Sequence, residues 1–128
     1  MRLLLDTHAV IWWFLGNVRM PLKIREIIDD ESNVVHVSAA SAYEISLKAG
    51  LCKLPEAIEL AGRLREMAIE QDFLPLDVTI AHALAAGALP ATHRDPFDRL
   101  LVAQARIEGL LLVSNERVFD AFGVGRLW

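Results

Sequence analysis

An α/β fold with three layers, in which helices cover both faces of a mostly parallel sheet of four to five strands, is the fold class that the sequence predicts. Short apolar runs alternate with longer segments whose apolar residues recur every three or four positions. The apolar runs are nearly continuous, as in strands that are buried on both faces. Hydrophobic residues make up 54% of the 128 residues, so we expect one well-buried domain over residues 1–128.

The expected strands are short and rich in apolar or β-branched residues. "LLLD" ends in an acid, "NVVHVS" is β-branched, and "LLLVS" is apolar enough to lie inside the sheet. In chain order, strands are expected at residues 3–6, 33–38, 72–77, 110–114 and 124–128, the last at an edge of the sheet.

The expected helices have apolar residues at helical spacing and ends of familiar composition. Pro55 and Pro96 stand at first helical positions, where proline is favoured. Gly50 and Gly109 follow the last periodic residues, as C-terminal glycines often do. In chain order, helices are expected at residues 9–15, 39–50, 55–71, 78–89, 96–109 and 115–123.

Charge and composition narrow the classes of function. The formal net charge of −4 argues against a protein that coats nucleic acid, but not against an enzyme that meets it through bound metal and a few arginines. The single cysteine, Cys52, permits no internal disulfide and is interpreted as structural, in a reducing cytosol. Asp6 and His8 interrupt the apolar N-terminal stretch, so we expect neither a signal peptide nor a membrane span, and a cytoplasmic protein.

Acidic side chains gather where the expected strands end and the expected helices begin. Asp6 ends the first strand, and Glu116 lies just beyond the strand at 110–114. Glu44 lies in the helix after the second strand, while Asp95 and Asp98 open the helix at 96–109. Because ligands of open parallel sheets bind beyond the carboxyl ends of the strands, we expect up to five carboxylates to share one cleft.

Each acid also has a structural interpretation. Residues 41–44 match a capping box, and Asp95 before a proline is a good N-cap. Asp98 falls at the third helical position, where the helix dipole favours negative charge. Asp6 can accept N–H groups of the next helix and Glu116 can sit in a first turn, but an acid that closes an apolar strand is costly unless paired, which favours function for Asp6.

Capping alone does not explain the coincidence of so many carboxylates. Crowded carboxylates repel and raise one another's pKa, and a divalent cation removes that conflict. Oxygen ligands without cysteine or paired histidine indicate Mg²⁺ or Mn²⁺ rather than zinc. We therefore expect Asp95 to start its helix and Asp98 to face a metal.

Four segments resemble PIN-domain proteins, specifically the VapC-like toxins of bacterial toxin–antitoxin pairs. They are "LLLDTHAVIWW", "VSAASAYEISLKAGLCKL", "HRDPFDRLLVAQA" and "LLVSNERVFDAFGV", in the family's order and spacing. The resemblance implies a PIN-like fold and a Mg²⁺- or Mn²⁺-dependent endoribonuclease that cleaves RNA. It also implies a homodimer inhibited by a small cognate VapB-like antitoxin.

By position, the family acids fall on Asp6, Glu44 and Asp98, and Asp95 matches an additional acid of the subgroup. We assign Asp6 and Asp98 as direct metal ligands. Glu44 is expected to bind the metal through water or to position the attacking water, and Asp95 joins the set of metal residues. The last motif usually has aspartate where this chain has Glu116. Glutamate adds a methylene, so we expect Glu116 to belong to the catalytic group through a bound water or a second ion.

Arginines and histidines are secondary candidates. Arg94, Arg99 and Arg117 flank the acids, where they can contact phosphates. His8 is close enough to Asp6 in sequence to touch substrate, and no histidine is assigned a catalytic role.

Two other classes fit part of the sequence. A haloacid-dehalogenase-like phosphatase also has an aspartate at the end of its first strand, but it needs a second aspartate where this chain has His8 and a late lysine, and none follows Lys53. A non-catalytic PIN-like binding module is the other alternative, left open by Glu116.

Overall fold

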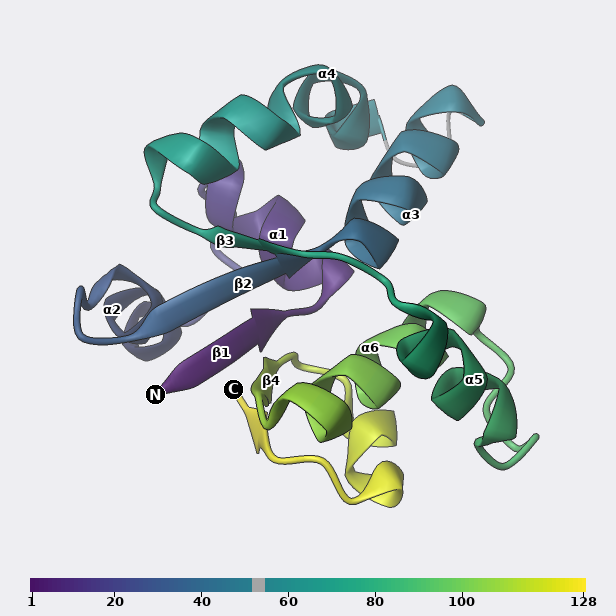
Figure 1. The fold of residues 1–128 in the computed structure, drawn as a ribbon. Coiled ribbons are helices and arrows are strands. Elements are labelled where there is room, and N and C mark those ends of the chain that lie inside the picture. Colours follow the sequence, from purple (N-terminus) through teal and green to yellow (C-terminus); the bar gives the residue numbers. More distant parts are fainter. Residues whose placement is uncertain (52–54) are drawn as a thin grey trace.

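A five-stranded sheet is the centre of the molecule, and the predicted parallel sheet is confirmed (Figure 1). The computed structural model describes residues 1–51 and 55–128, so the interpretation of Cys52 lies outside the described residues. The strand order is β3-β2-β1-β4-β5, and every neighbouring pair is parallel. The strands are β1 (Arg2–Leu5), β2 (Val34–Ser38), β3 (Leu74–Leu76), β4 (Leu111–Val113) and β5 (Arg126–Leu127).

The helices of the described ranges pack on both sides of this sheet (Figure 1). They are α1 (Thr7–Phe14), α2 (Leu22–Asp29), α3 (Ala39–Gly50), α4 (Pro55–Glu70), α5 (Ile80–Ala88), α6 (Pro96–Glu108) and the 3₁₀ helix η1 (Arg117–Phe122).

Alternation along β1 divides the apolar residues between two cores. Leu3 and Leu5 point into the core that α1, α2, α3 and α4 share, for example through Ile45. Leu4 points the other way, into the core formed with α6 and η1, which contains Phe119. These side chains are fully buried, so the three expected layers are present.

The helix α2 lies between the first two strands, where no helix was expected. Ile24 and Ile28, one turn apart, are 1% and 4% exposed and pack in the first core. Pro21 stands at the N-cap position without a side-chain hydrogen bond. The apolar stripe of this short helix is narrow and most of its other residues are charged. The apolar periodicity was therefore too weak to predict a helix from the sequence.

The start of α3 corrects the predicted capping box at residues 41–44. The helix begins directly after β2, and the Ser38 hydroxyl oxygen accepts the Ala40 N–H at 3.0 Å. Ser41 and Glu44 therefore lie inside the helix rather than at its cap. With no loop between β2 and α3, the helix starts at the end of the sheet and carries Glu44 on its second turn.

Two further segments differ from the secondary structure that the sequence predicts. The strand expected at 72–77 is limited to β3, because Asp72 takes a left-handed conformation with φ 57°. The helix expected at 115–123 is the 3₁₀ helix η1.

Trp12 is 6% exposed and Trp13 packs against the first core, so both tryptophans serve core packing.

Within the described ranges, no helix combines the length and the apolar character that crossing a bilayer requires.

Candidate active site

The carboxyl ends of the strands bring polar residues to one edge of the sheet. Asp6 follows β1 and Ser114 follows β4, and the Asp6 backbone N–H donates to the Val113 carbonyl at 3.1 Å. Ser38 ends β2 on the other side of β1. Because α1, α3 and η1 begin at this edge, their first turns surround it.

Asp6 is held rigidly at this edge. Its Oδ1 accepts the Ala9 N–H at 2.7 Å, which caps α1 as the sequence indicated. Burial raises the pKa of Asp6 to about 6, although the Ser114 hydroxyl, the Ala9 N–H and His8 act in the lowering direction. The nearby Glu116 carboxylate adds to the rise. The side chain is therefore both a helix cap and a carboxylate whose charge is poorly compensated.

Asp95 and Asp98 have different roles at the start of α6. Oδ1 of Asp95 accepts the N–H groups of Phe97 at 2.9 Å and Asp98 at 3.2 Å, so the predicted N-cap is confirmed. Asp98 is not needed for capping, and its Oδ2 lies 2.9 Å from His93 Nε2. Burial raises the pKa of Asp98 to about 6; His93 opposes the rise, while Asp95 and Glu116 add to it.

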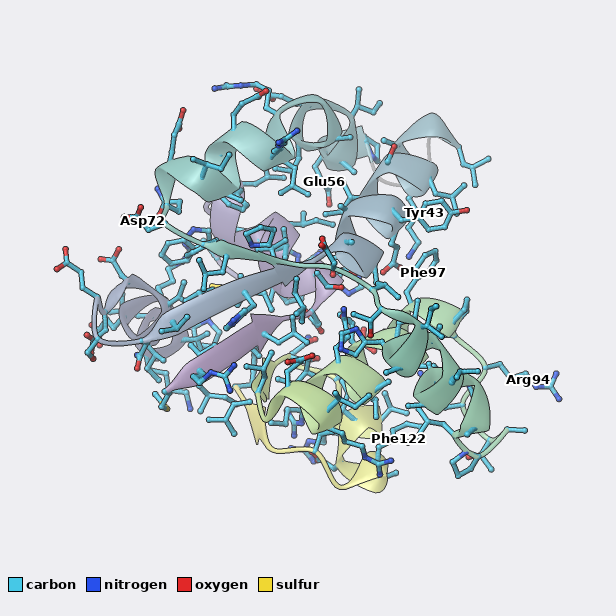
Figure 2. The ribbon with its side chains drawn as sticks, viewed as in Figure 1. Tyr43, Glu56, Asp72, Arg94, Phe97 and Phe122 are labelled. Carbon is cyan, nitrogen blue, oxygen red and sulfur yellow. The ribbon has the colours of Figure 1, made fainter. Side chains whose placement is uncertain are left out.

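Glu44 reaches the same region from α3 but is turned toward a lysine. Its side chain is 6% exposed, and Lys48 Nζ lies 2.5 Å from its Oε2. Tyr43 and Phe97, the residues before Glu44 and Asp98, have ring centroids 5.5 Å apart and lie side by side in Figure 2. This ring pair keeps α3 against the first turn of α6.

Glu116 lies at the more open rim. Its side chain is 37% exposed, and its Oε1 lies 3.4 Å from His8 Nδ1. The Glu116 backbone N–H donates to the Ser114 hydroxyl oxygen at 3.0 Å, so the loop after β4 is tied to the group that contacts Asp6. His8 in turn stacks on Trp12, with ring centroids 5.5 Å apart.

A buried polar framework, which the sequence did not reveal, supports the acidic residues. The Thr7 hydroxyl donates to Ser41 Oγ at 3.2 Å and joins the starts of α1 and α3. The Ser38 hydroxyl donates to Gln104 Oε1 at 2.6 Å and joins β2 to α6. All four side chains are buried, and every buried side-chain polar atom of the described residues has a hydrogen-bond partner. Fully satisfied buried networks of this kind are rigid.

Among residues 1–51 and 55–128, no three acidic or histidine side chains form a ready-made metal site. The donor chemistry nevertheless fits a hard divalent cation, because the carboxylates of the buried Asp6 and the half-buried Asp98 are both repelled by Glu116. In the part of the chain that the structure describes, neither carboxylate has a lysine or arginine within ion-pair distance. A divalent ion would relieve the cost that burial and repulsion impose on them.

The five predicted acids are thus placed differently. Glu116 acts electrostatically on both Asp6 and Asp98, and Asp95 acts on Asp98 while it caps α6. Glu44 is close enough to share Lys48 with Asp95 and Asp98 but is itself neutralised by that lysine.

The flanking cations do not all face the site. Arg99 donates hydrogen bonds to the carbonyl oxygens of residues 86, 87, 89, 90 and 93, so its guanidinium holds the chain between α5 and α6 and is not available to phosphate. Arg94 is exposed, and Figure 2 shows it pointing away from the body of the molecule. Lys48 and His93, to which the sequence assigned no role, contact the predicted acids on α3 and α6.

An apolar hollow of about 340 Å³ lies elsewhere, between α4 and the β3 edge of the sheet. Leu64, Phe73 and Pro75 line it, and none of the five acids does. Its lining offers little polar chemistry, so we place the candidate site at the acidic edge instead.

Comparisons with known proteins agree with this fold. A model of the PIN domain family matches residues 3–124. No curated protein matches the sequence well enough to count as a relative. Among solved structures, VapBC2 from Rickettsia felis bound to a DNA fragment from their promoter has a chain of similar fold, with a TM-score of 0.73 at 16% identity over 99% of this chain and 98% of that one.

FitAcB from Neisseria gonorrhoeae gives a TM-score of 0.65 at 20% identity, over 100% of this chain and 97% of that one. FitAB bound to an IR36 DNA fragment gives a TM-score of 0.65 at 19% identity, over 99% and 94% respectively. At these identities the likeness establishes the fold alone. Because the family model spans nearly the whole sequence, the chain belongs to the PIN domain family.

Proposed function

We propose that this chain is a metal-dependent endoribonuclease that hydrolyses RNA phosphodiester bonds with water, as the toxin of a toxin–antitoxin pair. The observation that carries the proposal is a pair of carboxylates at the carboxyl edge of a PIN sheet, the buried Asp6 and the half-buried Asp98, whose pKa values are raised to about 6, mainly by burial. PIN domains are generally nucleases and generally use divalent metal ions. The family match sets aside the haloacid-dehalogenase-like alternative.

In this proposal Asp6 and Asp98 hold Mg²⁺ or Mn²⁺ directly. Glu44 acts on the ion through water or positions the attacking water, and Asp95 supports Asp98 as the cap of α6. A bound ion would supply the electrophile that makes water nucleophilic near neutral pH and that neutralises charge on the scissile phosphate. The protein's own part is positioning. The Ala9 N–H and the Ser114 hydroxyl orient the Asp6 carboxylate, and His93 orients Asp98.

The proposed partners are RNA, a VapB-like antitoxin and a second copy of the chain. The motif resemblance to VapC-like toxins and the fold shared with a chain of VapBC2 support the antitoxin. An acidic site without a lysine or arginine on Asp6 or Asp98, in the described residues, suits coverage by an arginine or lysine from the inhibitor, which would compete with metal.

A cleavage assay on total RNA tests the proposed function. The purified chain should cleave RNA in Mg²⁺ or Mn²⁺ and leave 5′-phosphate and 3′-hydroxyl ends, because water is the nucleophile. Excess chelator should stop cleavage, and so should the proposed VapB-like antitoxin. Full activity in chelator contradicts metal dependence, while RNA binding without cleavage in Mn²⁺ favours the non-catalytic binding module.

The position of Glu116 leads to a second expectation. Glu116→Gln should lower kcat/KM for RNA by about 10- to 100-fold, short of abolition, because residues that act on a metal site from outside its direct ligands commonly cost this much. Its side chain is 37% exposed and its Oε1 lies 3.4 Å from His8 Nδ1, which supports a role outside the direct ligands. Calorimetric Mn²⁺ titration is the independent measurement, with Glu116→Asp as the matched control that keeps the charge. If Glu116→Gln loses Mn²⁺ as completely as Asp98→Asn, Glu116 is a direct ligand.

A further inference from the structure

Lys48 stands out as a cation built into the acidic site. It lies one helical turn after Glu44 on α3, and its Nζ is 2.5 Å from Glu44 Oε2. The carboxylate is 6% exposed and the lysine 30% exposed, so the pair lies largely out of solvent. A buried carboxylate is costly unless it is paired, and a glutamate four residues before a lysine has the favourable orientation on a helix.

The charge of Lys48 extends beyond this ion pair. Burial lowers the pKa of Lys48, but Glu44, Asp95 and Asp98 together raise it above its usual value. The ammonium group therefore lies in the field of the acids at the start of α6. The packing of Tyr43 on Phe97 keeps the two helices in this arrangement (Figure 2).

The acids of the site thus fall into two kinds. Glu44 has a full positive charge in contact. Among the described residues, Asp6 and Asp98 have hydrogen-bond donors and a histidine but no lysine or arginine. Asp95 caps α6, and Glu116 lies 3.4 Å from His8 at the exposed rim, so Asp6 and Asp98 are the two acids that we expect an external cation to neutralise.

We propose that Lys48 is the resident counter-ion of Glu44, so that this site takes one divalent cation, at Asp6 and Asp98, and not two. The inference rests on the proposed function, since it specifies how the metal-dependent site is filled. Lys48 acts through Glu44 and is a positioning residue. The ion pair with Lys48 keeps the Glu44 carboxylate from binding the metal directly. The positive charge of Lys48 also takes the position that a second ion would need.

Calorimetric titration with Mn²⁺ alone tests the stoichiometry. The parent chain and Lys48→Arg, which keeps the charge, should each bind one Mn²⁺. Lys48→Gln frees Glu44 and removes a repelling charge, so it should bind a second Mn²⁺ or bind the first at least about tenfold more tightly. A parent that binds two ions, or a Lys48→Gln variant unchanged in number and affinity, overturns the inference and leaves the metal-dependent function standing. A parent that binds no Mn²⁺ overturns the metal site and the inference with it.

A second measurement needs no metal. In chelator, Lys48→Gln should lower the melting temperature by at least about 4 °C, because it leaves a buried carboxylate unpaired. Glu44→Gln in the same chain should recover most of that loss, since the unpaired charge is then gone. A double-mutant cycle without coupling between the two positions contradicts the pairing, whatever the titration gives.

Discussion

Asp98→Asn should lower RNA cleavage by more than about 100-fold, beyond the usual loss from residues that only support metal ligands. The substitution removes one of the two carboxylate charges proposed to hold the ion. The fold should survive, because Asp95 and not Asp98 caps α6. An asparagine oxygen can still accept from His93 Nε2, which lies 2.9 Å from the present carboxylate. Single-turnover cleavage and Mn²⁺ calorimetry on the same preparation are the measurements.

Asp120→Asn is the matched control for this loss. Asp120 is an acid near the same end of the chain, but its side chain is 55% exposed and pairs with Arg126 at the surface. Exposed ion pairs contribute little to stability, so cleavage should stay within about twofold of the parent. If Asp98→Asn keeps both Mn²⁺ binding and cleavage, the metal is held elsewhere.

Much of this site was predictable because its determinants are local. The apolar runs before Asp6 and Glu116 predict buried parallel strands, and acids at their ends must then lie at one edge of the sheet. Asp95 before a proline predicts the start of α6, which is confirmed. For these residues, position along the chain already fixes position in space.

The rest depends on side-chain directions. Lys48 lies four residues after Glu44 on α3 and His93 lies five residues before Asp98, and it is the direction of each side chain that brings it onto a carboxylate. The misplaced cap of α3 has a similar origin. Ser41 fits the capping pattern, but β2 runs directly into the helix and Ser38 takes that place.

The pH dependence of stability gives the second large expectation, in metal-free protein. Asp6 and Asp98 have pKa values of about 6 in the fold, raised mainly by burial, against the ordinary value of 3.8. Between these values the folded chain holds protons that the unfolded chain has released. The stability that protonated Asp6 and Asp98 give is therefore full below pH 3.8 and is lost as the pH rises through about 6.

Asp6→Asn isolates the contribution of one carboxyl group. A pKa shift of about two units corresponds to about 3 kcal/mol as an upper value, so the variant should exceed the parent by about 2 kcal/mol in unfolding free energy at pH 7.5. Near pH 4 the two should be alike, because Asp6 is protonated in the fold and an asparagine oxygen still accepts the Ala9 N–H. Urea unfolding in chelator at both pH values measures the difference.

Asp30→Asn serves as the control, because it should not raise the unfolding free energy at pH 7.5 as Asp6→Asn does. Hydrogen bonds from the Ser32 N–H and hydroxyl lower the pKa of the exposed Asp30, so its ionised form favours the fold at neutral pH and its removal cannot stabilise the protein there. Mn²⁺ at pH 7.5 should then stabilise the parent, which has the charge to bind it, far more than Asp6→Asn. If the unfolding free energies of the parent and Asp6→Asn differ by the same amount at every pH, the charge of Asp6 is not what destabilises the metal-free fold. Equal stabilisation of both by Mn²⁺ would show that the ion does not need that charge, and the metal site proposed for Asp6 and Asp98 would be wrong.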